Sequence, residues 1–315
     1  MKNKIPPFPL SRPTLEEAKE DFNALIKSKV DIKEGCWQAR GGVVGSDYIG
    51  LDRTGSKVSN HYHWFARMAC DSLNSPSAMR SWYSKQFRKG IENSKFYAKN
   101  PASALMLRKY IPSQFRPAAA KSLLEHFKVK KWYDPCGGWG DRLCAAQAAG
   151  VEYHCRDVNP LVFSGYSAQQ EEYGGDVSFE YKGAEQDGPE KGYFDFVFTS
   201  PPYWKQEQYM GKEQSFLKYK GFENWRDSFL LPMMENAWDA LSRNGVFAIN
   251  ISNVYANHTE NDLLSPVLSF ITEKTQDFSM IGYQIPKRPG QHSLKHNKEK
   301  GVFVEPILIG VKNVA

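Results

Sequence analysis

The sequence predicts an α/β fold in which a mostly parallel sheet of seven strands has helices on both faces. Short β-rich runs alternate with helical segments from about residue 130 to residue 311. A glycine-rich loop follows the first run, and the fourth run ends at two consecutive prolines. Because ligands bind at the carboxyl ends of parallel strands, both loops are expected on one edge of the sheet. The expected strands are 131–134, 152–157, 177–180, 195–198, 246–251, 279–285 and 302–311, and the last is expected to be antiparallel.

Composition favours a soluble globular protein. The chain of 315 residues is 41% hydrophobic and 24% charged, enough to bury the core of one elaborated domain or two small ones. Its net charge of +6 permits a polyanionic partner without requiring one. The cysteines lack CxxC spacing, no apolar run is long enough to span a membrane, and the proline-rich start does not resemble a signal peptide. We therefore expect a cytoplasmic protein with reduced thiols and no membrane partner.

The glycine-rich loop predicts a ligand site. It has the sequence DPCGGWG at 134–140, and a helix is expected to run from about Asp141 to Gly150. Glycines let the backbone approach a ligand without a clash at Cβ, and the helix N-terminus offers free N–H groups. The dinucleotide fingerprint GxGxxG is absent, so this is not expected to be a dinucleotide site.

Polar side chains follow the second and third expected strands. The second strand ends in Asp157, about twenty residues past the glycines. An acid at this position accepts hydrogen bonds from ribose hydroxyls. The third strand is followed by the polar segment 183–187, which contains Asp187. A ligand that contains a ribose is therefore expected.

The fourth strand ends in a rigid turn with the sequence Thr199-Ser200-Pro201-Pro202-Tyr203-Trp204. Proline fixes φ and has no N–H, so strand pairing stops there. The turn carries a hydroxyl, a fixed run of backbone carbonyls and an aromatic face at the ligand-binding edge of the sheet.

Two of these loops resemble motifs of one enzyme family. Ser200-Pro201-Pro202-Tyr203 resembles motif IV of the amino-methyltransferases, (Asp/Asn/Ser)-Pro-Pro-(Tyr/Phe), and 134–140 resembles motif I of the S-adenosylmethionine-dependent methyltransferases. The segments 183–187 and 115–124 resemble motifs III and X. The resemblance covers about residues 110–311 and implies the Rossmann-like class I methyltransferase fold with S-adenosylmethionine as cofactor. It implies catalytic roles for Ser200, Pro201, Pro202 and Tyr203, and cofactor contacts for Phe115, Arg116, Asp134, Pro135, Gly137, Gly138, Gly140, Asp157 and Asp187.

The reaction that this resemblance implies is methyl transfer to an exocyclic amine of a DNA base. The lone pair of such an amine is delocalised, so the nitrogen must become pyramidal in line with the methyl group. The Ser200 hydroxyl and the carbonyls around Pro201 can accept the amine hydrogens, and Tyr203 offers a stacking face to a flipped base. The serine form of motif IV is most typical of cytosine-N4 enzymes, and the aspartate form is typical of adenine-N6 enzymes.

Alternatives stay open. The same chemistry could act on adenine N6 in DNA, on an RNA base or on a protein glutamine amide. The cofactor motifs precede the catalytic motif, whereas many serine-type N4 enzymes have the opposite order, and this weakens the cytosine assignment. A nucleic-acid-binding protein that keeps the fold without turnover is disfavoured by the intact motifs. A C5-cytosine enzyme is disfavoured because the Pro135-Cys136 pair lies in the cofactor loop, so Cys136 is interpreted as a small loop filler.

Residues 1–109 match no motif and are interpreted as an N-terminal extension for nucleic-acid recognition, ahead of a catalytic domain at 110–315. The segment 80–110 has eight basic residues against one acid, with aromatic residues between them. Basic groups neutralise phosphates and aromatic rings stack on bases. This segment and the basic stretch 287–300 are expected to border the cleft that contains Ser200. The residues expected to bind nucleic acid are Arg80, Lys85, Arg88, Lys89, Lys95, Trp204, Lys287 and Arg288.

The expected partner is DNA, with RNA as the alternative. His61 and His63 are the best candidates for a pair of metal ligands, but no Cys or carboxylate lies at ligand spacing from them. No metal is therefore expected.

Overall fold

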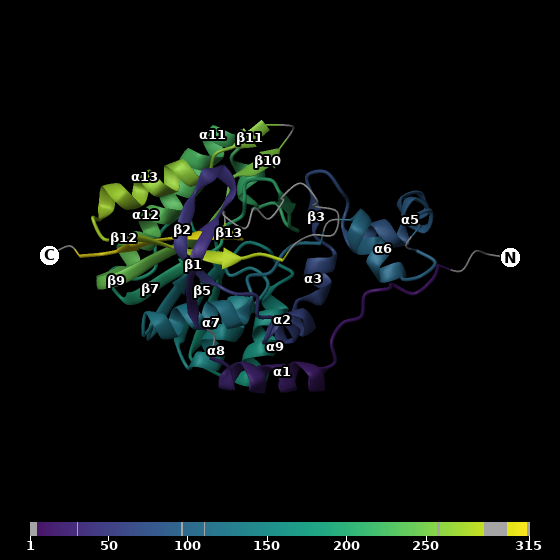
Figure 1. Ribbon diagram of the computed structural model, residues 1–315, viewed down its shortest axis with the longest axis horizontal. Coiled ribbons are helices and arrows are strands. Elements are labelled where there is room, and N and C mark those ends of the chain that lie inside the picture. The colour runs from purple at the N-terminus through teal and green to yellow at the C-terminus, as the bar shows by residue number, and fades with distance from the viewer. Residues whose placement is uncertain are drawn as a thin grey trace.

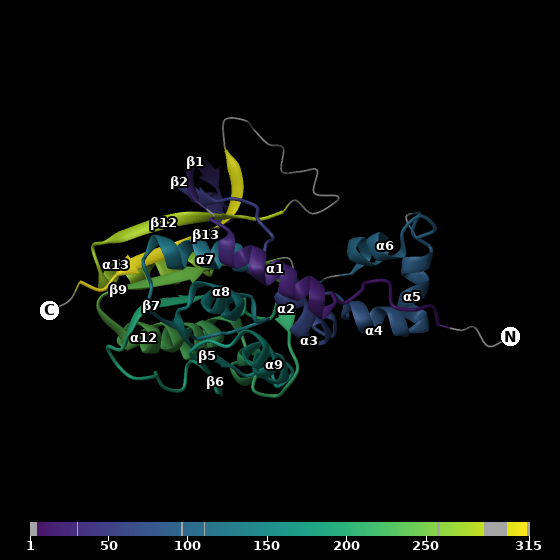
Figure 2. The same ribbon diagram turned by 90° about the horizontal axis from the view of Figure 1, so that it is seen from below.

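A single large sheet forms the centre of the protein (Figures 1 and 2). The computed structural model describes residues 5–29, 31–95, 97–109, 111–256, 259–286 and 301–313. The strands of the sheet are β1 (Ile32–Gln38), β2 (Val44–Ile49), β4 (Lys131–Asp134), β5 (Glu152–Asp157), β6 (Val177–Tyr181), β7 (Phe194–Thr199), β9 (Leu241–Asn250), β12 (Phe278–Gln284) and β13 (Val302–Val311). Their order in the sheet is β1-β2-β12-β13-β9-β7-β4-β5-β6.

The sheet has the arrangement that the sequence predicted. The strands β6, β5, β4, β7 and β9 run parallel, whereas β13 is antiparallel to both β9 and β12. Trp132 of β4 lies opposite Phe196 of β7, so the loops after these strands leave the same edge. The Rossmann-like class I methyltransferase fold is therefore confirmed. Among the described residues this sheet has nine strands rather than seven, because β1 and β2 of the expected N-terminal extension join it.

Helices cover both faces of the sheet because alternate residues of the central strands point to opposite sides. In β7, Phe196 and Phe198 belong to the core beneath α7 and α8, whereas Val197 between them belongs to the core beneath α12 and α13. The helices on the two faces are visible in Figure 1. They are α7 (Pro117–His126), α8 (Asp141–Ala149) and α9 (Phe163–Tyr173) on one side, and α12 (Leu231–Ala240) and α13 (Leu264–Lys274) on the other.

The strands β1, β2, β12 and β13 close on one another around a tryptophan. β1 pairs with both β2 and β13, and β2 pairs with β12, so each of the four strands has two neighbours in the set. Trp37 lies between them and is 1% exposed. A Cβ added to Gly45 would lie 2.3 Å from the Trp37 ring, so only glycine fits opposite this side chain. The first two strands of the chain are thus held against its last two strands.

The rest of the N-terminal segment is helical. α1 begins with a capping box in which the Thr14 hydroxyl accepts from the Glu17 N–H and the Glu17 carboxylate accepts from the Thr14 N–H. α2 and α3 follow beside α8 and α9, and α4, α5 and α6 form a lobe that projects from the sheet (Figure 2). The lobe has a core of its own around Trp82, Ile91 and Leu105. The bounds are α1 (Leu15–Lys27), α2 (Ser56–Tyr62), α3 (Trp64–Met68), α4 (Ala78–Tyr83), α5 (Lys85–Glu92) and α6 (Pro101–Arg108).

Two short strand pairs lie outside the large sheet, and the first of them joins the N-terminal segment to the loop after β7. β3 (Asp71–Ser72) pairs with β8 (Glu207–Gln208), and β10 (Val254–Ala256) pairs with β11 (Thr259–Asn261). The remaining helices are α10 (Ser215–Lys218) and α11 (Phe222–Trp225), and a π-helical turn at Arg226–Leu230 leads into α12. Among the described residues we find no helix with the length and apolar character that crossing a membrane requires.

Candidate active site

Two cavities meet at the carboxyl edge of the parallel strands. The larger has a volume of about 720 Å³ and the smaller about 70 Å³. Four residues line both of them: Gly138, Trp139, Ser200 and Tyr209. The glycine loop after β4 and the proline turn after β7 therefore form the junction of the two cavities.

The glycine loop takes a backbone shape that glycine favours. Gly138 and Gly140 have φ values of +67° and +74°, in the left-handed region. A Cβ at Gly140 would also lie 2.3 Å from Nε2 of His63, which is buried against the loop. Of the glycines expected to contact the cofactor, Gly137 and Gly138 line the cavities, whereas Gly140 contacts His63 and lines neither. Pro135 lines the small cavity as expected.

Asp157 at the end of β5 lines the small cavity and is held by the backbone. Its two carboxylate oxygens accept from the N–H groups of Gly138 and Asn159, each at 2.8 Å. Burial raises the pKa of the Asp157 carboxyl to about 6, although these two N–H groups act in the opposite direction. Each oxygen keeps a further lone pair, so the carboxylate can accept from the hydroxyls of a ribose.

The raised pKa of Asp157 predicts how nucleoside binding depends on pH. Hydroxyl donors favour the charged carboxylate, so S-adenosylhomocysteine should bind less tightly as the pH falls through about 6. Asp157→Ala should weaken binding by about 1–3 kcal/mol at pH 8. Calorimetric titrations from pH 5 to pH 8 would measure both effects. This role of Asp157 is excluded if Asp157→Asn binds S-adenosylhomocysteine as tightly as the unmodified protein does and its affinity still falls near pH 6.

The loop after the proline turn covers the small cavity. Tyr209, Gln214 and Phe216 line it. The end of the loop is fixed to the segment after β6, where Nζ of Lys218 lies 2.6 Å from the buried Glu185 carboxylate. Asp187 of the same segment was expected to contact the cofactor, and this is corrected here. Its side chain is 56% exposed, pairs with Arg156 and Lys182, and lines neither cavity.

Asp134 was also expected to contact the cofactor, but its position gives it another role. It is fully buried and accepts from Nε of Arg142 at 2.6 Å and from the Tyr153 hydroxyl at 2.7 Å. It lines neither cavity. Arg142 in turn donates to the carbonyl of Cys136 within the glycine loop. Asp134 therefore fixes the loop through Arg142 rather than touching a ligand.

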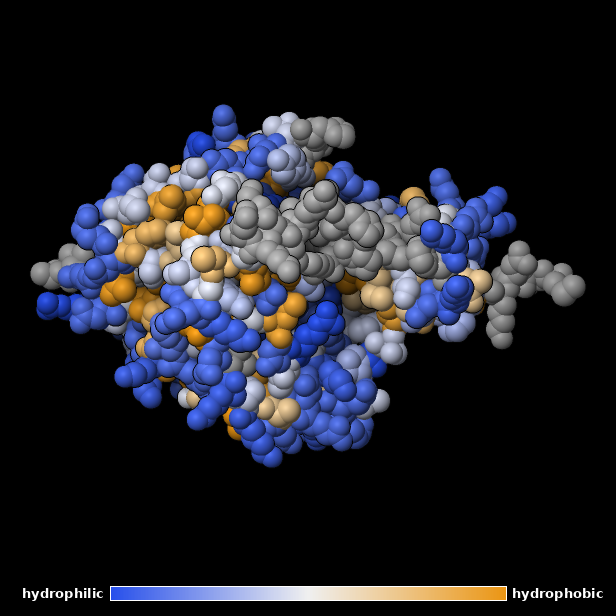
Figure 3. Space-filling view, viewed as in Figure 1, coloured by the Kyte–Doolittle hydropathy of each residue, from blue (hydrophilic) through white to orange (hydrophobic). Residues whose placement is uncertain are grey.

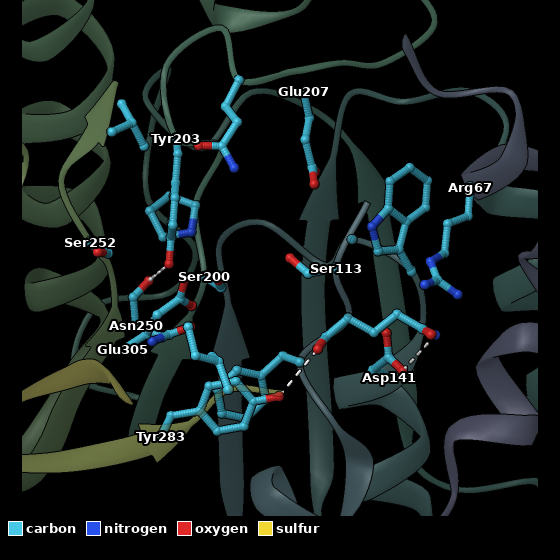
Figure 4. Close-up of a pocket in the computed structure, with 18 of the residues that line it drawn as sticks. Arg67, Ser113, Asp141, Ser200, Tyr203, Glu207, Asn250, Ser252, Tyr283 and Glu305 are labelled. Carbon is cyan, nitrogen blue, oxygen red and sulfur yellow. Dashed lines mark hydrogen bonds between the residues drawn. The ribbon is translucent and has the colours of Figure 1, made fainter. Parts of the chain in front are cut away.

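The proline turn presents its groups to both cavities, as Figure 4 shows for the larger one. Ser200 lines both cavities, Pro201 and Tyr203 line the larger, and Pro202 lines the smaller. The Tyr203 hydroxyl donates to the backbone carbonyl of Asn250 at 3.2 Å, which fixes the ring. Trp204, expected to bind nucleic acid, follows with a φ of +51° and lines the large cavity.

The segment before α7 forms one wall of the large cavity. Phe115 stacks on Tyr283 with ring centroids 4.3 Å apart, and the Arg116 guanidinium lies 4.1 Å from the centroid of the same ring. Arg116 also donates to the carbonyl of Gln284 at 2.6 Å. Both residues, predicted to contact the cofactor, line the large cavity, and the buried guanidinium of Arg116 is held by the protein itself.

A buried carboxyl and an arginine lie at one end of the large cavity, opposite the end with Ser200 (Figure 4). The Asp141 carboxylate at the start of α8 accepts from the Ser59 hydroxyl at 2.5 Å and from the Gln114 amide at 3.1 Å. Burial raises the pKa of Asp141 to about 7. Arg67 lies nearby, where it donates to Asn60 and to the carbonyl of Pro112. This end offers groups of both charges to a zwitterionic ligand.

Several of these cavity residues were missed from the sequence. Asn250 is the last residue of β9 and Ser252 follows the strand, and the strand-end rule that found Asp157 and Ser200 applies equally to them. Asp141 could have been found as an acid in the first turn of the helix after the glycine loop. Ser59 and Arg67 carry no motif, and only the fold of the N-terminal segment brings them here.

The basic segment 80–109 does not border the cavities. Within the described residues, none of its side chains lines either of them. The prediction that Arg88 binds nucleic acid is corrected, because its side chain is buried, donates to the Trp82 carbonyl and pairs with Glu92. Arg80 pairs with Asp71, whereas Lys85, Lys89 and Lys95 are exposed. Hydrophilic side chains cover α5 at the outer end of the lobe in Figure 3. The expected site residues Lys287 and Arg288 lie outside the described residues.

Three side chains weighed for other chemistry have structural roles. The His63 ring is buried against the glycine loop, and burial lowers its pKa to about 3, so it is neutral. His61 contacts the Pro13 carbonyl at 2.7 Å. The Cys136 side chain lines the small cavity, and burial raises the pKa of its thiol, so the nucleophilic thiolate is disfavoured.

No family model and no curated protein matches the sequence. Among solved structures, the chain is similar to the tRNA methyltransferase TrmI from Aquifex aeolicus at 12% identity, over 65% of this chain and 72% of that one, with a TM-score of 0.42. It is similar to an rRNA methylase from Streptococcus thermophilus at 13% identity, over 65% and 100% of the two chains, with a TM-score of 0.38. It is similar to the N-methyltransferase NodS from Bradyrhizobium japonicum, in complex with S-adenosylhomocysteine, at 9% identity, over 75% and 97%, with a TM-score of 0.41. Likeness at this level carries no conclusion about substrate, which depends on the site itself.

Proposed function

We propose that this protein is a methyltransferase that transfers a methyl group from S-adenosylmethionine to an exocyclic amine of a nucleic-acid base, with cytosine N4 in DNA as the first candidate. One observation carries the proposal. Ser200 lies at the junction of a small cavity lined by Asp157, an acceptor for ribose hydroxyls, and a large cavity that can admit a second molecule. A group at such a junction can act on an atom that passes between the two ligands.

The two cavities fit the two halves of the cofactor. The small cavity offers Asp157 to the ribose hydroxyls, and Pro135 and Ala184 form apolar walls for the adenine. The Asp141 carboxylate and the Arg67 guanidinium at the far end of the large cavity complement the ammonium and carboxylate of the amino-acid part. The cofactor would supply a methyl group on a positively charged sulfur. Gly138, which lines both cavities, would contact the cofactor where its two halves meet.

The proline turn is suited to an amine acceptor. The Ser200 hydroxyl and the Pro201 carbonyl can accept the two hydrogens of an exocyclic amine, which orients the nitrogen lone pair toward the methyl carbon. The N–C bond then forms as the C–S bond breaks, and the extra proton leaves the nitrogen toward Ser200 and solvent. Since Pro201 and Pro202 fix the backbone beforehand, little reorganisation is needed. The buried Cys136 thiol is not required, because an amine attacks directly.

The choice of cytosine N4 in DNA depends on the serine at position 200 of the motif. Serine offers a neutral hydroxyl where the adenine-N6 enzymes have an aspartate. Adenine N6 in DNA and an amine of an RNA base remain the alternatives for the same site. Residues 110–313 carry the cofactor motifs, and we propose that residues 1–109 contribute substrate recognition, since Arg53 and Arg67 reach the large cavity.

Release of S-adenosylhomocysteine tests this proposal. The protein is incubated with S-adenosylmethionine alone, with single-stranded DNA, with duplex DNA and with RNA of the same sequence. We expect release that depends on nucleic acid and that is largest with DNA containing cytosine. Release only with RNA would replace DNA as the substrate, and no release with any nucleic acid would contradict the proposal.

A further inference from the structure

We propose that Arg40 and Arg53 bind the backbone phosphates of the nucleic-acid strand whose base enters the large cavity, so the mouth of the cavity is a phosphate site built by the N-terminal segment. This inference rests on the proposed function. It assigns strand binding to the turn between β1 and β2 and to the loop after β2, rather than to the basic lobe of α4, α5 and α6.

The cations of the large cavity divide into two groups. Three of its arginines have other roles: Arg116 donates to the Gln284 carbonyl, Arg142 pairs with Asp134, and Arg67, held by Asn60 and the Pro112 carbonyl, is the one proposed for the carboxylate of the cofactor. Arg40 and Arg53 also line the cavity, yet they are exposed, and within the described ranges neither makes an ion pair or a hydrogen bond. These two guanidinium groups remain available to an anion.

Two acids in the segments that neighbour these arginines have other partners. Asp52, next to Arg53 in the chain, accepts from the N–H and the hydroxyl of Thr54 at 2.8 and 2.7 Å. Glu260 accepts from the Tyr255 hydroxyl at 2.9 Å and from the Asn253 amide at 3.2 Å. Neither carboxylate is directed at Arg40 or Arg53, so the positive charge of the mouth is not neutralised by a direct ion pair.

The mouth is a fixed junction of two distant parts of the chain. Arg40 begins a short 3₁₀ turn, Arg40–Gly42, between β1 and β2, and a Cβ added to Gly41 would lie 3.3 Å from the Asn253 amide nitrogen. Asn253 in turn accepts from the N–H groups of Leu263 and Leu264 at the start of α13. The turn that carries Arg40 therefore packs against Asn253, which is itself held at the start of α13.

An aromatic side chain lies beside the cations. Tyr255 of β10 lines the cavity, is 62% exposed, and its hydroxyl is held by Glu260. Arg40 is close enough to Tyr255 to oppose the rise in the pKa of its phenol. A fixed aromatic face beside unpaired guanidinium groups is the arrangement that binds a nucleic-acid strand, since bases stack while phosphates pair with arginine. A base next to the flipped one is the expected partner of Tyr255.

Binding of a fluorescent twelve-nucleotide strand with one cytosine, measured at several salt concentrations, tests the inference. The double variant Arg40→Gln/Arg53→Gln should bind less tightly, and its slope of log affinity against log salt should fall by about 1.4, because each lost contact with single-stranded DNA removes about 0.7. The variant Arg40→Lys/Arg53→Lys should keep most of the slope. Affinity for S-adenosylhomocysteine should not change, which also shows that the variants fold.

Lys130→Gln/Arg243→Gln is the matched control. It removes two exposed charges before β4 and early in β9, at the edge of the sheet opposite the cavities, and should leave the slope unchanged. An unchanged slope in Arg40→Gln/Arg53→Gln overturns the inference and leaves the proposed function intact. Deoxycytidine monophosphate that binds as tightly as the strand, with the same loss in the variant, also overturns it, because the site would then hold a single nucleotide. Absence of all nucleic-acid binding in the unmodified protein contradicts the proposed function as well.

Discussion

Ser200→Ala should reduce the methylation rate by about 10²-fold, or about 2.7 kcal/mol in activation free energy, the size of effect that loss of one preorganised polar group has at a reacting centre. The Ser200 hydroxyl is the side-chain acceptor of the proline turn that lines both cavities, so its loss leaves an amine hydrogen unpaired as the nitrogen becomes pyramidal. Affinity for S-adenosylhomocysteine should change little, because Asp157 and the glycine loop are untouched. Single-turnover rates together with calorimetry would separate these two effects.

Ser252→Ala provides the matched control for that variant. Ser252 is a buried serine that lines the same large cavity from the segment after β9, and Figure 4 shows it beside Asn250. It does not line the small cavity, so it is not at the junction. We expect its removal to change the rate by less than about threefold, within about 0.7 kcal/mol. Equal rates for Ser200→Ala and Ser252→Ala would show that Ser200 has no special role.

Asp134→Ala should lower the free energy of unfolding by about 3–5 kcal/mol, because it leaves the buried Arg142 guanidinium without its carboxylate. The Tyr153 hydroxyl loses its acceptor in the same variant. The midpoint of urea denaturation would measure the loss. If Asp134 were instead a cofactor contact, the variant would unfold normally and bind S-adenosylhomocysteine weakly.

A second variant keeps the test of Asp134 informative if the first one is too unstable to purify. Asp134→Leu/Arg142→Met replaces the pair by apolar side chains, which often costs little in stability. We expect it to be more stable than Asp134→Ala but to bind S-adenosylhomocysteine less tightly, since Arg142 no longer holds the Cys136 carbonyl and the glycine loop is free to move. A double variant no more stable than Asp134→Ala would contradict the role assigned to this ion pair.

The parts of the site that the sequence predicted are those governed by local rules. Glycines after one strand, an acid after the next and a double proline after a third each indicate a strand end, and parallel strands place all three at one edge. Gly138, Asp157 and Ser200 were found in this way, and the structure places them at or beside the junction of the cavities. Asn250 obeys the same rule and was missed because it has no motif.

The other assignments did not take account of partners within the protein. Asp134 was assigned to the cofactor because the motif does not show that Arg142 turns back toward it. Arg88 was assigned to nucleic acid although its partner Glu92 lies four residues on, a spacing typical of helical ion pairs that the sequence does show. β1 and β2 close on β12 and β13 because Trp37 packs against Gly45 and Gly282. Since β2 and β12 lie some 240 residues apart in the chain, no local sequence pattern indicates that they pair.

The most direct test of the account is to identify the methylated atom. DNA and RNA of the same sequence are incubated with the protein and S-adenosylmethionine that carries a deuterated methyl group, digested to nucleosides and analysed by mass spectrometry. The account predicts labelled N4-methyldeoxycytidine from DNA, reduced about 10²-fold with Ser200→Ala. A label on adenine N6 or on an RNA amine would change the substrate but keep the mechanism. A label on carbon 5 of cytosine, or the same labelling with Ser200→Ala, would contradict the central claim that Ser200 orients an amine for methyl transfer.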